Sequence, residues 1–149
     1  MKPIRLFGHP VHPPLVHLPM GALPLAFVAD IVAIMDGSRQ WWFIAFWLLV
    51  AGLCGAAVAA TGGVLDYLAL GDDERGDEER VVRTANRHLT LMIAAGTCFL
   101  VRLLMQHSPA GPGGANPVLL LCCSALGTIL LLIGSWFGGD LVQGKSRNE

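Results

Sequence analysis

Apolar residues run through this chain in four long blocks that polar and charged positions separate. The blocks cover about residues 15–35, 41–64, 88–106 and 117–137. Each is close to the roughly 20 residues that a helix needs to cross the hydrocarbon of a bilayer. Within each block the apolar positions are continuous and do not alternate, which argues against the strands of a membrane β-barrel. The pattern therefore predicts an all-α integral membrane protein with four transmembrane helices.

The connections between the blocks determine how the helices are arranged. Two connections are short, residues 36–39 and the Pro- and Gly-rich residues 107–116. Short connections make neighbouring helices antiparallel. The middle connection, about residues 66–87, is longer and charged. We predict a single domain over residues 1–149, an antiparallel four-helix bundle with the middle loop and both termini on one side of the membrane.

Composition and charge support this assignment and orient the chain. The sequence is 54% hydrophobic and 14% charged, against about 25% charged in an ordinary soluble domain. It has 10 basic and 11 acidic residues, so it lacks the basic excess typical of nucleic-acid binding. The side with the termini holds Lys2, Arg5, Arg75, Arg80, Arg83, Arg87, Lys145 and Arg147. The positive-inside rule then places both termini in the cytoplasm.

Aromatic residues lie where the two surfaces of the bilayer are expected. Trp41, Trp42 and Trp47 mark the outer interface, and Trp136 and Phe137 the inner one. Tryptophan is enriched at both membrane–water interfaces because its ring is amphipathic. These positions agree with the predicted orientation.

The two predicted hairpins resemble each other weakly. His17 opens the first helix and His88 the third, and Asp30 and Arg102 follow them by 13 and 14 residues. This spacing predicts two hairpins related by a parallel repeat, with Asp30 and Arg102 at similar depth. An isolated charge in a span is costly, so such residues pair or face a polar cavity. We expect an Asp30–Arg102 ion pair that holds the hairpins together.

Histidines gather at the cytoplasmic ends of the predicted helices. His9, His12 and His17 occur within nine residues, and the interleaved prolines favour an extended lead-in before the first helix. His88 lies at the same predicted depth as His17. The first and third helices are diagonal in a simple bundle, so two imidazoles can bind a haem iron from both sides.

A haem b in this position would make the chain an electron-transfer protein, with a quinone or a redox protein as partner. Arg83 and Arg87 are placed to pair with the haem propionates. Residues on the same helix faces as the two histidines would line an apolar slot: Gly21, Pro24 and Val28 on the first helix, and Met92, Ala95, Phe99 and Arg102 on the third.

The same cluster supports two other functions. Imidazoles and carboxylates are ligands for zinc, copper or non-haem iron, which indicates a protein that binds or transports a transition-metal ion. The candidate ligands are His9, His12, His17, His88, Asp66 and Asp140. The third possibility is a structural or assembly subunit whose histidines only bond to helix ends. The sequence contains neither a nucleophile elbow nor a nucleotide-binding glycine loop, so neither motif points to an enzyme.

Small residues share one face of the second and of the fourth predicted helix. They are Gly52, Ala56, Ala59 and Gly63, and Gly127, Gly134 and Gly138. Small faces allow close helix packing in lipid, suit a homodimer, and leave room for a flat cofactor. We interpret Cys54, Cys98, Cys122 and Cys123 as packing residues within the spans, and we assign no role to His107.

Several segments resemble domain-of-unknown-function family 2231, a family of small bacterial membrane proteins. They are the opening Gly-His-Pro-x-His-Pro-x-Leu-Val-His-x-Pro-x-Gly of residues 8–21, Asp30, and residues 62–67, 83–88 and 138–142. The resemblance implies a four-helix domain in the bacterial cytoplasmic membrane. Some relatives are joined to Rieske-type iron–sulfur or cytochrome domains, which favours a redox function.

The chain departs from the family pattern at two places. Relatives usually continue after the closing Leu-Val with an aromatic residue and a His-Gly step, where this chain reads Gln143-Gly144-Lys145. Many relatives have Asn where this chain has Thr90. No role for that terminal histidine therefore carries over to this chain.

Overall fold

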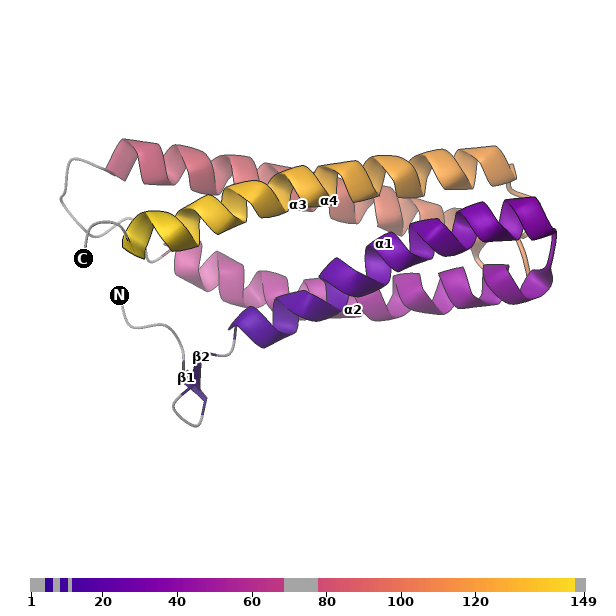
Figure 1. The fold of residues 1–149 in the computed structure, drawn as a ribbon, viewed down its shortest axis with the longest axis horizontal. Helices are drawn as coiled ribbons and strands as arrows, with labels where there is room; N and C mark the ends of the chain where they lie inside the picture. Colours follow the sequence, from indigo (N-terminus) through magenta and orange to yellow (C-terminus); the bar gives the residue numbers. More distant parts are fainter. Residues whose placement is uncertain (1–4, 7–8, 11, 69–77, 147–149) are drawn as a thin grey trace.

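The protein folds into four long helices. The computed structural model describes residues 5–6, 9–10, 12–68 and 78–146, and the side chains of residues 16–64 and 80–141. The helices are α1 (His12–Asp36), α2 (Arg39–Leu68), α3 (Glu78–Gln106) and α4 (Pro117–Ser146) (Figure 1). Two short strands, β1 (Arg5–Leu6) and β2 (His9–Pro10), pair antiparallel before α1. All four helices are long and apolar enough to cross a membrane, which confirms the predicted all-α membrane bundle.

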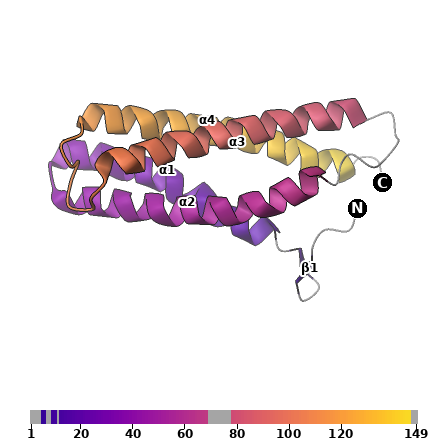
Figure 2. The ribbon, with the colours of Figure 1, turned by 180° about the vertical axis from the view of Figure 1, so that it is seen from behind.

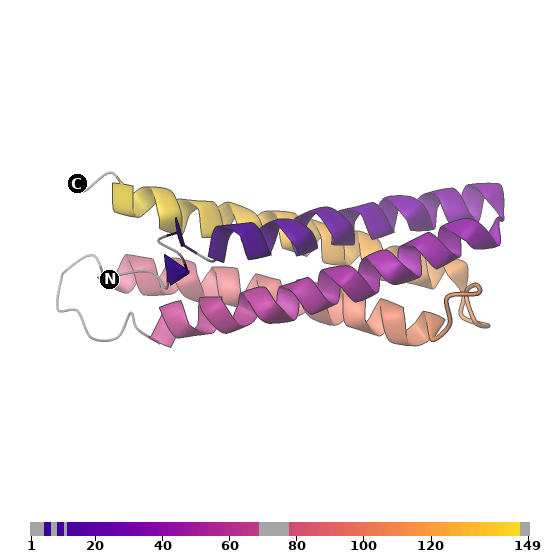
Figure 3. The same ribbon diagram turned by 90° about the horizontal axis from the view of Figure 1, so that it is seen from below.

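The helices form two antiparallel hairpins that lie side by side. α1 packs along α2 and α3 along α4, and the hairpins meet through α1 with α4 and through α2 with α3. Figures 2 and 3 show this ring from behind and from below, with α1 and α3 diagonal to each other. We call the end with the two short connections the loop end. The other end, where α1 begins and α4 ends, is the terminal end.

Three helices reach further at the terminal end than the apolar pattern predicts. α3 begins at Glu78 and not near residue 88, α4 continues to Ser146 and not 137, and α2 to Leu68 and not 64. The apolar pattern stops where charged residues begin, but a helix can continue into water because its backbone hydrogen bonds are internal. His88 is therefore well inside α3 and does not open it.

The start of α1 also differs from the prediction. His12 is the first residue of α1, whereas the prolines predict an extended lead-in there. Pro13 and Pro14 fit because the first turn of a helix has no intrahelical partner for its N–H groups. His9 lies before the helix, in β2.

The core is made of apolar side chains from all four helices. Leu23, Leu49, Phe99 and Leu131 form its centre, and a second cluster around Trp42 lies towards the loop end. The outer faces are apolar as well, including Leu25, Ile93 and Ile129. An apolar surface around the whole bundle is what a lipid environment requires.

Glycines set the distance between the helices of each hairpin. A Cβ atom at Gly52 would lie 2.6 Å from Leu23 Cδ2, and one at Gly127 would lie 2.9 Å from Phe99 Cε2. In both hairpins the second helix therefore supplies a glycine that receives a side chain of the first. The small faces predicted on α2 and α4 serve close packing within each hairpin.

We expect Gly127→Ala to destabilise the bundle by about 1–3 kcal/mol, the usual cost of overpacking a filled core. The added methyl group would meet the ring of Phe99, which is fully buried and has little room to move. Thermal unfolding in detergent micelles, followed by helical circular dichroism, measures the effect. Gly139→Ala is the matched control, because it adds the same methyl group to α4 at a position where the new Cβ atom would have open space around it. Equal stabilities of the two variants would contradict this packing.

Candidate functional site

A buried ion pair joins the two diagonal helices. Arg102 of α3 donates from Nε to Oδ2 of Asp30 on α1 at 3.0 Å, and its Nη2 donates to Oδ1 of the same carboxylate. Both side chains are fully buried. The paired donors of the guanidinium match the two carboxylate oxygens, which makes this a strong type of charged hydrogen bond. The structure thus brings together the two residues that the weak repeat places at one depth.

Three further residues extend the pair into a network that reaches every helix. Arg102 Nη1 donates to Gln106 Oε1, and Gln106 Nε2 donates to the carbonyl of Trp42 on α2 at 3.1 Å. From α4, Ser124 Oγ donates to Asp30 Oδ2 at 2.8 Å. We call Asp30, Trp42, Arg102, Gln106 and Ser124 the polar network. Each helix contributes at least one member, so the network fixes the relative depth of all four.

The polar network is closed. Among the side chains that the structure describes, no buried nitrogen or oxygen atom lacks a hydrogen-bond partner. Arg102 Cζ also lies 5.9 Å from the centre of the Trp42 ring, over its face. Because each buried polar atom of the network already has a partner within the protein, the arrangement favours a structural role over chemistry.

Sequence reasoning missed three members of the network. Gln106 was detectable, because it follows Arg102 by four residues and so lies on the same helix face. Ser124 is one of three hydroxyl residues in the fourth apolar block, with Thr128 and Ser135, so it is a weak signal. Trp42 takes part through its backbone carbonyl, and a carbonyl gives no sequence signal at all.

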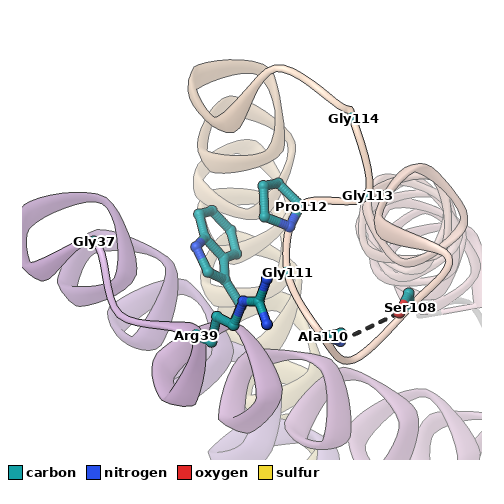
Figure 4. Close-up of a pocket in the computed structure, with 9 residues that line it drawn as sticks. Gly37, Arg39, Ser108, Ala110, Gly111, Pro112, Gly113 and Gly114 are labelled. Carbon is teal, nitrogen blue, oxygen red and sulfur yellow. Dashed lines mark hydrogen bonds between the residues drawn. The ribbon is translucent and has the colours of Figure 1, made fainter.

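An open depression lies at the loop end, next to the polar network (Figure 4). Gly37, Arg39, Trp42 and the loop residues 108–114 line it, apart from Pro109. Trp42 borders both this depression and the polar network, so its indole ring lies between Arg102 and the loop-end surface.

His88 lies at the interface between α3 and α4, towards the terminal end. Its Nδ1 is 2.8 Å from the carbonyl oxygen of Gly134. A carbonyl only accepts, so Nδ1 carries the proton in this bond and Nε2 of the neutral ring keeps its lone pair. A Cβ atom at Gly138 would lie 3.0 Å from His88 Cε1. The glycine therefore leaves the space that the imidazole ring needs.

His17 lies at a similar depth on α1 but on a different side of the bundle. Met20, one turn after His17, accepts a hydrogen bond at its sulfur from Ser135 Oγ on α4, at 3.1 Å. Ser135 belongs to the same turn of α4 as Gly134, which contacts His88. The His17 side chain is exposed, however, and it does not share the inward face of α1 that carries Asp30.

The slot predicted between α1 and α3 is not formed by the residues expected to line it. On α1, Gly21 and Val28 are exposed, Val28 by 49%. On α3, Ala95 and Phe99 are buried in the core against Leu23. A haem held between His17 and His88 within one chain therefore does not fit this arrangement, because one ligand points outwards and core side chains fill the space below.

The remaining candidate residues are dispersed or lie outside the described side chains. Arg83, Arg87 and Asp140 are exposed. The side chains of His9, His12 and Asp66 lie outside the described set. Within the described residues, no group of three or more His, Cys, Asp or Glu side chains lies close enough together to hold a metal ion. The metal site predicted from these residues therefore stays a prediction.

A family model described as "Predicted membrane protein (DUF2231)" matches residues 8–146. The chain belongs to the DUF2231 family. No curated protein and no solved structure matches the chain. The resemblance carried by the sequence motifs is confirmed, together with the assignment as a membrane protein.

Two of the segments that carry the DUF2231 resemblance meet in the structure. His88 ends the segment 83–88, and its ring contacts Gly138, which begins the segment 138–142. A third motif position, Asp30, belongs to the polar network. The motifs therefore mark two places in the bundle: the buried ion pair near the loop end and the histidine near the terminal end.

We expect Asp30→Ala to destabilise the bundle by about 3–5 kcal/mol, because it leaves the Arg102 guanidinium buried without its counter-charge. Arg102→Met should have a similar effect through the unpaired carboxylate. The double variant should be clearly more stable than the sum of the two losses predicts, since it leaves no uncompensated charge. Thermal unfolding in detergent measures all three.

Arg39→Gln is the control for these variants, because Arg39 is exposed at the start of α2. Its replacement should leave stability unchanged within about 0.5 kcal/mol. Strictly additive losses in the double variant would show that Asp30 and Arg102 do not depend on each other.

Proposed function

We propose that this DUF2231 protein is an electron-transfer subunit of the bacterial cytoplasmic membrane, with His88 as an axial ligand of a haem b at the terminal end of the bundle. The observation that carries the proposal is the hydrogen bond from His88 Nδ1 to the carbonyl of Gly134. Histidines that bind metals nearly always donate their other ring N–H to a carbonyl or carboxylate. This bond holds the tautomer whose Nε2 can bind iron.

The packing restricts where such a haem can bind. Core side chains occupy the space between α1 and α3 from Met92 inwards. The haem therefore belongs at the terminal edge of the bundle, beside the turn of α4 that contains Gly134 and Gly138. His17 is exposed, so we do not assign it as the second axial ligand. A bound haem would supply one-electron transfer between a quinone or soluble donor and a redox partner.

The charges of the chain favour one orientation in the membrane. Of the basic side chains that the structure describes, Arg80, Arg83 and Arg87 lie at the terminal end, and Arg39 lies at the loop end. The positive-inside rule therefore favours a cytoplasmic terminal end. A reporter that is active only in the cytoplasm should be active when fused after Glu149. It should be inactive when inserted between Pro112 and Gly113, in the loop-end connection. The reverse result would contradict the orientation.

The haem proposal predicts a coloured protein. Protein purified from haem-replete cells should show a Soret band, and His88→Ala should abolish it because Nε2 is lost as a ligand. His17→Ala should keep the band. His107→Ala is the matched control, since His107 is exposed at the loop end and bonds only locally, to the Met105 carbonyl.

The same preparations separate the other functions. A colourless protein with one equivalent of zinc, copper or iron and no porphyrin would replace this proposal with metal binding. A colourless protein without metal, whose folding and partners survive His88→Ala, would indicate a structural or assembly subunit. A Soret band lost in His17→Ala and kept in His88→Ala would show that the ligand has been assigned to the wrong helix.

A further inference from the structure

Three arginines form a stripe along the first turns of α3. Arg80, Arg83 and Arg87 are all exposed, and their spacings of three and four residues place them on one face of the helix. With about 100° between successive residues, this face lies about 100° around α3 from His88. We call these three residues the arginine stripe.

The length of α3 places the arginine stripe at the membrane surface. α3 has 29 residues and is therefore about 43 Å long at 1.5 Å per residue, against about 30 Å of hydrocarbon. At the loop end, α3 ends at Gln106, where the short connection to α4 begins. A span of about 20 residues crosses the hydrocarbon. Counted back from Gln106, this span ends close to Arg87. Arg83 and Arg80 then lie in the headgroup layer.

An exposed tryptophan on the neighbouring helix gives the same depth. Trp136 is 75% exposed, and it lies between Gly134 and Gly138, the two residues that contact His88. Tryptophan in this exposed position is typical of the interface between headgroups and hydrocarbon. Both α3 and α4 therefore place the bilayer surface within about one helical turn of Arg87.

The side chain of Arg87 is held across the hairpin. Its Cζ lies 5.9 Å from the centre of the Phe137 ring, over the face of the ring. A cation over an aromatic ring is attracted by the negative face of the π system. The contact keeps one guanidinium at the edge of the hydrocarbon. Among the side chains that the structure describes at this end of α3 and α4, the three guanidiniums outnumber the exposed carboxylate of Asp140.

We propose that the arginine stripe binds the headgroup of an anionic phospholipid in the leaflet at the terminal end. Guanidinium groups bind phosphate oxygens through paired hydrogen bonds, and basic residues beside a membrane helix attract anionic lipids. The site does not depend on the haem proposal. It assigns Arg83 and Arg87 to lipid binding and not to haem propionates, and the two roles can be distinguished.

The test uses the full chain, purified from bacterial membranes with its native lipids and examined by native mass spectrometry. The wild-type protein should retain phosphatidylglycerol or cardiolipin in preference to phosphatidylethanolamine. In the triple variant Arg80→Gln, Arg83→Gln, Arg87→Gln, the ratio of retained anionic lipid to phosphatidylethanolamine should fall at least about tenfold. Arg39→Gln is the matched control: it also removes one exposed arginine, at the loop end, and should retain the anionic lipid.

A second triple variant, with lysine at all three positions, distinguishes bidentate binding from charge alone. Lysine keeps the charge but lacks the planar fork, so retention should fall between those of the wild-type protein and the glutamine variant. Circular dichroism checks that each variant is folded. Unchanged lipid retention in a folded glutamine variant would overturn the proposal. So would a shifted or lost Soret band without loss of lipid, which would assign the arginines to haem propionates.

Discussion

The guanidinium of Arg102 is the group on which the rest of the bundle depends. A cation this deep among apolar helices is stable only with a counter-charge and with its remaining donors satisfied. Asp30 supplies the charge, and Gln106 takes a further donor. The requirement is directional, so it fixes the depth and rotation of α1 against α3. Apolar packing in lipid gives little such register, because lipid tails are as apolar as leucine.

The polar network and the glycines hold different pairs of helices together. The network acts between the hairpins, because its bonds join α1 to α3 and α4, and α3 to α2. The glycines act within each hairpin, where Gly52 receives Leu23 and Gly127 receives Phe99. Within the described residues, the buried polar groups of the loop-end half thus find their hydrogen-bond partners inside the protein. At the terminal end, His88 uses Nδ1 for its bond to the Gly134 carbonyl.

The contrast between His17 and His88 shows why matching depth does not make a site. One turn of α4 contacts both His88 and Met20, and Met20 follows His17 by one turn of α1. His88 packs against Gly138, whereas His17 is exposed. Rotation about the helix axis separates them, and rotation of α1 is set by Asp30, about four turns away. A pair of axial ligands requires matching depth and matching rotation together.

The residues alone were enough to predict the four spans, the antiparallel order and the Asp30–Arg102 pairing. A span must be apolar for about 20 residues, and a charge inside it must find a partner, so both leave a direct trace in the pattern. Three features became visible only in the folded bundle. They are the face of α1 that turns inwards, the core side chains that fill the slot between α1 and α3, and the bond from His88 to the Gly134 carbonyl. Those outcomes depend on helix rotation and on backbone atoms such as the Trp42 carbonyl. Neither can be recognised from the type of residue at a position. Every residue has a backbone carbonyl, and helix rotation is settled only when all four helices pack together.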